Sequence, residues 1–486
     1  MNKGVRMPKR HPDPVLIFRK ERFCMREKKL GLPSAISTGV GLIVASSCLL
    51  TLGSGIGLAG PEFILSMAIV LVLNICLALS FTELHALMPE ADGGMGQYTL
   101  AGLGPVVSIV SNVSAYVMVN LFAASVELAM CGQVLNETFL PMVPAPVISV
   151  AALLLLCYVN YCGVDLFARI QNIVVGLLLL SLIGMGILSF FGLGTGEYIT
   201  AAEQTAPTVT GIGGVFSLTA TAFWLFIGIE FVIPISKDLK NPKRDVPLAM
   251  VLGITMLFVI QSVLGVGMTH YVTLEDLSTA SLPHMVFAAN LLGRPGEIWM
   301  GVITLLAGIS TANTALGAVP NILAGMAEND LMPAVFRKRN KHGVAVAGIA
   351  LIAGGNAIFI VTGFTASAGL SNMLLAASCF WLTSYILISL TVLVLRHRYP
   401  DHPARNKRLM LGGAPQLLCI VGNLYMIWHI ADGDARILIY RLFLSIFVVL
   451  VAFAVIWVKV IKKQKLFAHS ELEEINEKSA RNMISV

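Results

Sequence analysis

The chain has 486 residues, of which 56% are hydrophobic and 12% are charged, and its mean hydropathy is +0.82. A soluble globular chain carries about 25% charged residues, so this composition excludes an assembly of soluble domains. The net charge of +6 gives little support to nucleic-acid binding, because topology determines where basic residues lie in a membrane protein. The composition therefore predicts a protein of several membrane-spanning helices.

Twelve apolar segments are candidates to cross a hydrocarbon core about 30 Å thick, which takes about 20 helical residues. Helices are expected because a backbone in lipid must satisfy its own hydrogen bonds. The predicted spans are residues 36–59, 63–82, 105–131, 146–163, 170–191, 214–236, 246–270, 297–327, 344–363, 369–395, 411–430 and 437–461.

The distribution of Lys and Arg supports this number of spans. If residues 1–35 lie in the cytoplasm, the outer segments carry only Arg294, Arg436 and Arg441, and the other 30 of the 33 basic residues fall on inner segments. Such asymmetry follows the positive-inside rule, and residues 1–35 lack the apolar stretch of a secretory signal. The sequence therefore predicts that both termini are cytoplasmic and that the basic N-terminal tail contacts anionic lipid.

The first span is rich in small residues between positions 39 and 57. Small residues commonly let helices approach closely. The alternative is a helix that unwinds near Ala45, Ser46 and Ser47, so that any substrate carboxylate would bind the N–H groups near Ala45–Cys48. The N–H groups freed at the new helix N-terminus would then attract a carboxylate.

The sixth span carries a similar signal, because Gly228 lies close to Glu230. Carbonyl groups freed near Phe226, Ile227 and Gly228 would attract a substrate ammonium. A charge at the bilayer centre costs about 2.5–3.5 kcal/mol, so Glu230 is expected to face a cavity or a partner. It either tunes the charge of a transport site or carries a coupled proton, or it braces neighbouring helices. Glu127 in the third span either has a comparable role or reaches the outer interface.

Other polar residues within the spans are weaker candidates. Asn112 and Asn120 of the third span are candidates to face the cavity, and Thr311 and Thr314 of the eighth span are candidate cation ligands. Hydroxyl groups in membrane helices more commonly bond a preceding carbonyl or cross-link helices. The sequence has no Walker-type loop, no HExxH motif and no CxxC pair, so we expect no metal site, no cofactor and no enzymatic activity.

Three strings of residues together resemble the amino acid–polyamine–organocation superfamily. The resemblance extends over nearly the whole chain, from about residue 30 to residue 460. The strings are Lys240-Asn241-Pro242-Lys243-Arg244-Asp245-Val246-Pro247, Met326-Ala327-Glu328-Asn329-Asp330-Leu331-Met332-Pro333, and Phe81-Thr82-Glu83-Leu84 with Pro89 and Gly93-Gly94 after it.

This resemblance implies an all-α membrane protein of 12 transmembrane helices with a LeuT-like 5+5 inverted repeat, in which helices 1 and 6 are discontinuous. Transport by alternating access is implied as well. The parts expected are a cytoplasmic N-terminal tail (1–35), a first five-helix repeat (36–191), an extracytoplasmic loop (192–213), a second five-helix repeat (214–395), helices 11 and 12 (396–461) and a cytoplasmic C-terminal tail (462–486).

The motif from Trp224 to Glu230 most resembles that of antiporters of basic amino acids and polyamines. The resemblance implies that Trp224 helps to close the site from outside and that Glu230 responds to pH. Three departures argue against arginine itself as the substrate. The Gly-Ser-Gly of the family's first helix is Ala45–Ser47 here, an aromatic position of the eighth helix falls at about Ala315, and a Lys of the fifth helix falls near Leu178. Whether the cargo has a carboxylate stays open.

The sequence thus predicts a permease or antiporter of the cytoplasmic membrane for an amino acid or a related cationic amine. A sodium-coupled symporter of an organic amine and a non-transporting sensor on the same fold are the alternatives. We expect lipid and a small-molecule substrate as partners and no nucleic acid, and the choice between monomer and homodimer stays open. The predicted binding residues are Ala45, Ser46, Ser47, Cys48, Asn120, Trp224, Phe226, Ile227 and Gly228, with Glu230 for proton coupling and Thr311 and Thr314 as a cation site.

Overall fold

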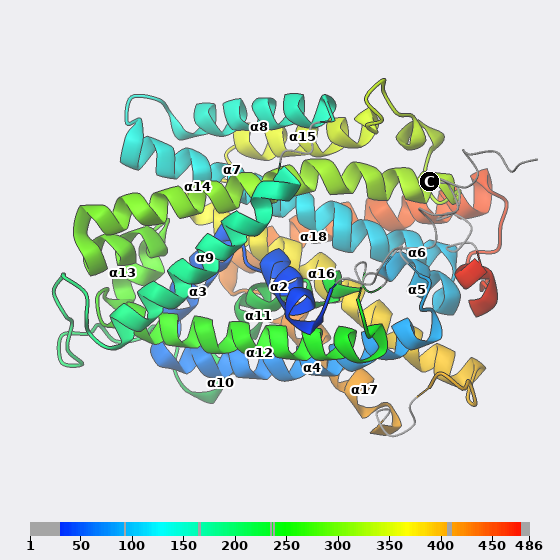
Figure 1. Cartoon of the computed structure of the whole chain (residues 1–486), viewed down its shortest axis with the longest axis horizontal. Coiled ribbons are helices and arrows are strands. Elements are labelled where there is room, and N and C mark those ends of the chain that lie inside the picture. Colours follow the sequence, from blue (N-terminus) through cyan, green and yellow to red (C-terminus); the bar gives the residue numbers. More distant parts are fainter. Residues whose placement is uncertain are drawn as a thin grey trace, which may run out of the picture.

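The computed structural model describes residues 30–91, 94–163, 167–233, 236, 239–405 and 411–477. Within these ranges the chain is helical, with one isolated bridge between Leu30 and Leu239. Most helices run along one common direction and form an elongated bundle (Figure 1). The all-helical class predicted from the sequence is confirmed for these residues.

The α-helices vary widely in length, and several are joined by short 3₁₀ or π segments. The α-helices are α2 (Leu32–Ile43), α3 (Ser46–Ala59), α4 (Phe63–Leu87), α5 (Met95–Leu103), α6 (Pro105–Asn112), α7 (Val119–Val134), α8 (Ala145–Tyr161), α9 (Phe167–Phe190), α10 (Gly211–Ser217), α11 (Thr219–Phe223), α12 (Pro242–Thr269), α13 (Leu274–Thr279), α14 (Pro283–Glu328), α15 (Val346–Val361), α16 (Ser367–Arg398), α17 (Ala414–Trp428) and α18 (Gly433–Ile456). The shorter segments are η1 (Gly60–Glu62), η2 (Val113–Met118), η3 (Leu135–Phe139), η4 (Trp224–Phe226), η5 (Ile229–Val232), η7 (Ala334–Arg337), η8 (Leu411–Gly413) and η9 (Trp457–Ile461).

Eight helical stretches of the described chain are long and apolar enough to cross a membrane, or nine if one bent pair is a single span. One of them, Ser46–Leu87, has 42 residues and contains part of the first predicted span and all of the second. A straight helix of that length would measure about 63 Å, twice the hydrocarbon thickness. Gly60 interrupts it with a non-helical backbone, φ 58° and ψ −146°. The multi-pass character is therefore confirmed, whereas the number twelve stays a prediction.

Apolar side chains at the periphery of the bundle are exposed, as lipid contact requires. Leu155 of α8, Leu180 of α9 and Val449 of α18 are each more than 60% exposed. In α18 only 17% of the most apolar window is buried, against 72% in the stretch Pro105–Phe139. The rod formed by α6, η2 and α7 is thus central, and it packs against α14 and α16.

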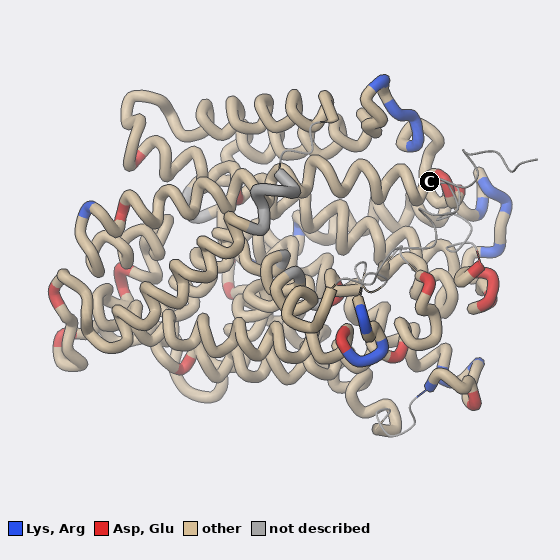
Figure 2. The backbone as a smooth tube through the Cα atoms, viewed as in Figure 1, with Lys and Arg blue, Asp and Glu red and all other residues tan. Residues whose placement is uncertain are grey.

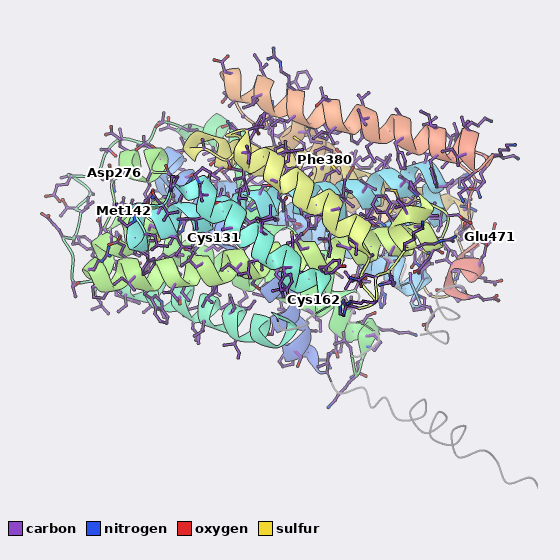
Figure 3. The ribbon with its side chains drawn as sticks, turned by 90° about the horizontal axis from the view of Figure 1, so that it is seen from above. Cys131, Met142, Cys162, Asp276, Phe380 and Glu471 are labelled. Atoms are coloured by element: carbon purple, nitrogen blue, oxygen red, sulfur yellow. The ribbon has the colours of Figure 1, made fainter. Side chains whose placement is uncertain are left out.

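The two ends of the bundle differ in charge. Asp276 and Met142 lie at one end and Glu471 lies at the other (Figure 3). Most of the Lys and Arg residues that the structure describes lie toward the end that contains Glu471, whereas few of them lie at the opposite end (Figure 2). We call the basic end the inner end, because the positive-inside rule predicts it to be cytoplasmic.

A buried ion cluster lies at the inner end, where α4 meets the C-terminus of α16. Glu83 accepts hydrogen bonds from Arg396, with Nη2 to Oε2 at 2.6 Å and Nε to both carboxylate oxygens at 3.1 Å. The Nε atom of Arg405 lies 3.0 Å from Glu83 Oε1, and the Arg405 side chain is fully buried. Arg405 also donates hydrogen bonds to the carbonyls of Leu395 and Tyr399 and so caps the C-terminus of α16. Glu83, part of one string that resembles the permease superfamily, thus holds two arginines together.

Candidate functional site

The first predicted span is interrupted near the position where the sequence predicts unwinding. Helix α2 ends at Ile43 and α3 begins at Ser46. Between them the backbone is extended, with φ −78° and ψ 112° at Val44 and φ −125° and ψ 168° at Ala45. The first-turn N–H groups of α3 are therefore available to partners outside the helix.

The sixth predicted span is interrupted as well. After α11 and η4 the chain is extended at Ile227 (φ −70°, ψ 135°), and Gly228 has the left-handed backbone φ 105°, ψ 18°. Only glycine adopts this conformation without a steric cost. A Cβ atom on Gly228 would also lie 2.7 Å from Cδ2 of Phe231. The chain then resumes as η5, which carries Glu230.

The two interruptions face each other across a cavity of about 160 Å³. Trp224 Nε1 donates a hydrogen bond of 3.1 Å to Ser47 Oγ, which ties η4 to the first turn of α3. The cavity is lined by residues of α2, α3, η2, α7, α9, η4, η5, α14 and α16. We call it the central cavity.

Seven of the twelve predicted site residues line the central cavity and five lie behind its wall. Those in the lining are Ala45, Ser47, Asn120, Trp224, Ile227, Thr311 and Thr314. Ser46, Cys48, Phe226 and Glu230 are buried outside the lining, and so is Gly228, whose backbone forms the break. The cavity also reaches Leu178, the position where the resembled family has a Lys, whereas Ala315 packs in the core.

Three aromatic side chains in the cavity wall are not among the predicted binding residues. Tyr116, Phe231 and Trp381 have ring centroids 6.0–6.4 Å apart in each pair, and each lines the central cavity. Tyr116 belongs to the π-helical segment η2, and such segments are frequent at functional sites. With Trp224, these side chains give the cavity an aromatic lining that suits an organic cation.

A second cavity of about 480 Å³ adjoins the first toward the inner end. Tyr116, Phe231 and Ile322 belong to both linings, so these three side chains lie between the two spaces. Asn112, the other predicted asparagine, lines this inner cavity. Its lining also includes Glu474 and Ile475 of the C-terminal segment.

Glu230 is buried beside the second interruption. Tyr385 OH donates a hydrogen bond of 2.8 Å to Glu230 Oε2, and the N–H of Gly228 donates to the same Tyr385 oxygen at 3.4 Å. Among the residues that the structure describes, Oε1 of Glu230 has no hydrogen-bond partner and its carboxylate has no ion-pair partner. Glu230 therefore links the broken backbone to α16 and has one oxygen left for a proton or a donor.

Glu127 does not reach the outer interface, because its side chain is fully buried. Its Oε1 atom accepts a hydrogen bond of 2.9 Å from the N–H of Ser47, and its Oε2 atom accepts one from the hydroxyl of Ser46. The carboxylate thus occupies the N-terminus of α3, a contact that the sequence spacing did not predict. This contact joins residues 80 positions apart.

The hydroxyl cluster of α14 is only partly engaged within its own helix. Thr314 Oγ1 donates to the carbonyl of Ser310 at 2.9 Å, as hydroxyl groups in membrane helices often do. Asn313 accepts a hydrogen bond of 2.7 Å from Asn160, which cross-links α14 to α8. Thr311 and Thr314 remain the candidate cation ligands, since both line the cavity.

Within the described ranges, no group of three or more His, Cys, Asp and Glu residues is arranged to hold a metal ion. The seven described cysteines are free thiols, and four of them are buried, namely Cys48, Cys131, Cys379 and Cys419. They do not form a disulfide framework in this part of the chain.

Known proteins with similar sequences are amino acid permeases and transporters. A family model described as "Amino acid permease" matches residues 30–470. The chain is 24% identical over 418 residues to the branched-chain amino acid permease BcaP of Bacillus subtilis (strain 168), covering 78% of this chain and 83% of that protein. It is 26% identical over 338 residues to the glutamate/serine transporter AimA of the same organism, covering 64% of this chain and 61% of AimA. The aspartate-proton symporter of that organism is 23% identical over 339 residues, covering 65% of this chain and 63% of the symporter.

Proposed function

This chain belongs to the amino acid permease family, and from that premise we propose that it is a secondary transporter, a permease or antiporter, of an amino acid or a related cationic amine. The observation that carries the proposal is the pair of interrupted helices on one central cavity. Interrupted helices near the membrane midplane supply free N–H groups for anionic groups and free carbonyls for cations. The family and its relatives are transporters, so an enzymatic role is excluded.

The proposed topology has twelve spans with both termini in the cytoplasm of the cell. The interruptions at Ala45 and Gly228 lie in the first helix of each proposed repeat, 36–191 and 214–395, with the helices of 396–461 following them. The interruption at Gly60 supports two passes within Ser46–Leu87, and the shorter apolar helices α8 and α15 would each supply one more. The basic inner end supports the orientation.

We propose that transport occurs by alternating access, because the packing differs between the outer and inner sides of the central cavity. Toward the inner end, the central cavity adjoins the larger inner cavity, and Tyr116, Phe231 and Ile322 belong to both linings. Toward the outer end, α3 and α13 pack so closely that a Cβ atom on Gly57 would lie 2.3 Å from the backbone nitrogen of Ser278. This arrangement fits a conformation closed on the outer side, with Trp224 fixed to Ser47 beneath the closure.

The test is uptake into proteoliposomes that contain the purified protein, with a panel of labelled amino acids and amines. Each compound is offered under a proton gradient, a sodium gradient and a gradient of unlabelled compound inside. We expect uptake of at least one compound above that of protein-free vesicles. Dependence on sodium that is lost in Thr311→Ala or Thr314→Ala would favour the symporter alternative. The absence of uptake and exchange across the panel would contradict transport and favour the sensor alternative.

We further propose that Glu230 carries a coupled proton or tunes the charge of the site. The described titratable side chains that face it are Tyr385 of α16 and Tyr116 of η2. In Glu230→Gln, uptake driven by a pH gradient is expected to fall about tenfold or more, because the side chain keeps its size but no longer titrates. Exchange of labelled for unlabelled compound at constant pH is expected to be retained.

The matched control is Glu275→Gln, because Glu275 is an exposed residue of α13 and the substitution is the same. It should leave both uptake and exchange unchanged. If Glu230→Gln keeps the wild-type rate and pH profile, Glu230 is a structural brace and its assignment to transport is wrong.

A further inference from the structure

The N-terminus of α3 is the anion-binding point of the first interruption, and the chain's own Glu127 occupies it. A helix N-terminus carries a partial positive charge and unpaired N–H groups. Here the N–H of Ser47 and the hydroxyl of Ser46 are both used by the Glu127 carboxylate. Ser46, Ser47 and Glu127 are each no more than 1% exposed, so this arrangement lies inside the bundle.

Close packing of α14 holds the Glu127 carboxylate in place. Gly308 lies against it, since a Cβ atom there would be 3.3 Å from Glu127 Oε2 and 2.6 Å from Cys131 Sγ. Cys131, one turn beyond Glu127 on α7, lies in the body of the bundle between its two ends (Figure 3). The carboxylate is therefore enclosed by α3, α7 and α14 and has little room to leave Ser46 and Ser47.

The enclosed carboxylate lies directly behind the wall of the central cavity. Ser47, its hydrogen-bond partner, lines the cavity, and so do Ala123, one turn before Glu127, and Ala307, next to Gly308. Neither Glu127 nor Glu230 has an ion-pair partner among the residues the structure describes. Two acidic groups without cationic partners thus flank a cavity whose lining includes four aromatic side chains.

This arrangement disfavours a ligand carboxylate at the first interruption. Two of the donors that could bind it, the N–H of Ser47 and the hydroxyl of Ser46, are already taken by Glu127, and leaving a buried carboxylate without donors is costly. A second carboxylate beside the first would also add repulsion between like charges. A cationic ammonium group has the opposite preference, because it is attracted both to nearby carboxylates and to aromatic faces.

We propose that Glu127 takes the place of the cargo's carboxylate, so that the transported molecule is a small organic amine without a carboxylate beside its ammonium group. This inference rests on the proposed transport function and narrows its substrate class. Glu127 acts through Ser47 as a specificity-determining residue, and Trp224, Tyr116, Phe231 and Trp381 contact the cation.

The test compares pairs of compounds that differ by one carboxylate, in proteoliposomes with the full-length protein. The pairs are agmatine and arginine, putrescine and ornithine, histamine and histidine, and isobutylamine and valine. For at least one pair we expect the amine to be taken up about ten times faster than the amino acid or more, since the carboxylate of the amino acid is repelled by that of Glu127. In Glu127→Gln, which keeps the size and the acceptor for Ser47, the ratio should fall to about threefold or less.

Glu137→Gln is the matched control, because Glu137 continues the same rod beyond α7 and is exposed. It should leave the ratio unchanged. Faster uptake of the amino acid member in every transported pair, or an unchanged ratio in Glu127→Gln, would overturn the inference while leaving the proposed transport intact.

Thermal unfolding of the detergent-solubilised protein separates the two claims, because a ligand that binds the folded state raises the melting temperature. If no compound is taken up but an amine of the panel raises the melting temperature of the wild type and not of Glu127→Gln, the amine site stands and transport is contradicted. If no pair gives uptake or a shift, both the amine site and the transport function are overturned.

Discussion

Replacing Glu83 with alanine is expected to lower the free energy of unfolding by about 3–5 kcal/mol, the cost of leaving a buried charge without its partner. Two guanidinium groups converge on this carboxylate, and the side chains of Glu83, Arg396 and Arg405 are 9%, 11% and 0% exposed. Without Glu83, two positive charges would face each other at the end of α16. The measurement is the melting temperature of the purified protein in detergent, followed by the fluorescence of its tryptophans.

The matched control for this variant is Asp330→Asn, which removes an ion pair with Lys462 at the surface and keeps a residue that tolerates the left-handed backbone of this position (φ 61°). Asp330 is 67% exposed, and exposed pairs contribute about 0–1 kcal/mol. A melting temperature of Glu83→Ala no lower than that of Asp330→Asn would contradict a stabilising role of the inner-end cluster.

Replacing Gly228 with alanine is expected to lower the free energy of unfolding by about 1–2 kcal/mol because of the left-handed backbone alone. This corresponds to a change of about 5- to 30-fold in the ratio of folded to unfolded protein. The added Cβ would also lie 2.7 Å from Cδ2 of Phe231, so this ring must move away from Tyr116 and Trp381. Because these rings form part of the cavity wall, uptake in proteoliposomes should fall by about tenfold or more.

Gly354→Ala provides the control for this glycine. Gly354 lies within α15, and a Cβ atom there meets no other atom within 4 Å. Alanine is favoured over glycine in a helix, so this variant should fold and take up substrate as the wild type does. Full uptake by Gly228→Ala, with protein of normal stability, would show that the left-handed turn is not needed for the site.

The helical class and the two interruptions could be predicted because their causes are local in the sequence. Apolar length predicts helices in a membrane, and small residues near Ala45 and Gly228 mark where a helix is easily broken. The structure places these breaks at Val44–Ala45 and at Ile227–Gly228. The number of spans is harder to predict from apolar length, because helices such as α3 and α4 follow each other with only Gly60–Glu62 between them.

The rest of the cavity wall could not be predicted, because it depends on contacts between residues far apart in the chain. Glu127 was recognised as an acidic residue in a span, yet its position on the N-terminus of α3 follows from how α7 packs against α3 and α14. Tyr116 and Trp381 are both more than 100 positions away from Phe231 in the chain, and only packing brings the three rings together. The pairing of Glu83 with Arg405 likewise spans most of the sequence.

The central claim is that two interrupted helices form one binding site for the transported molecule. Electron cryomicroscopy of the protein saturated with the amine that is taken up fastest tests it most directly. We predict ligand density in the central cavity between Ser47 and Ile227, with Glu127 still bound to Ser46 and Ser47. Density for the ligand elsewhere, or continuous helices through Ala45 and Gly228, would contradict the claim.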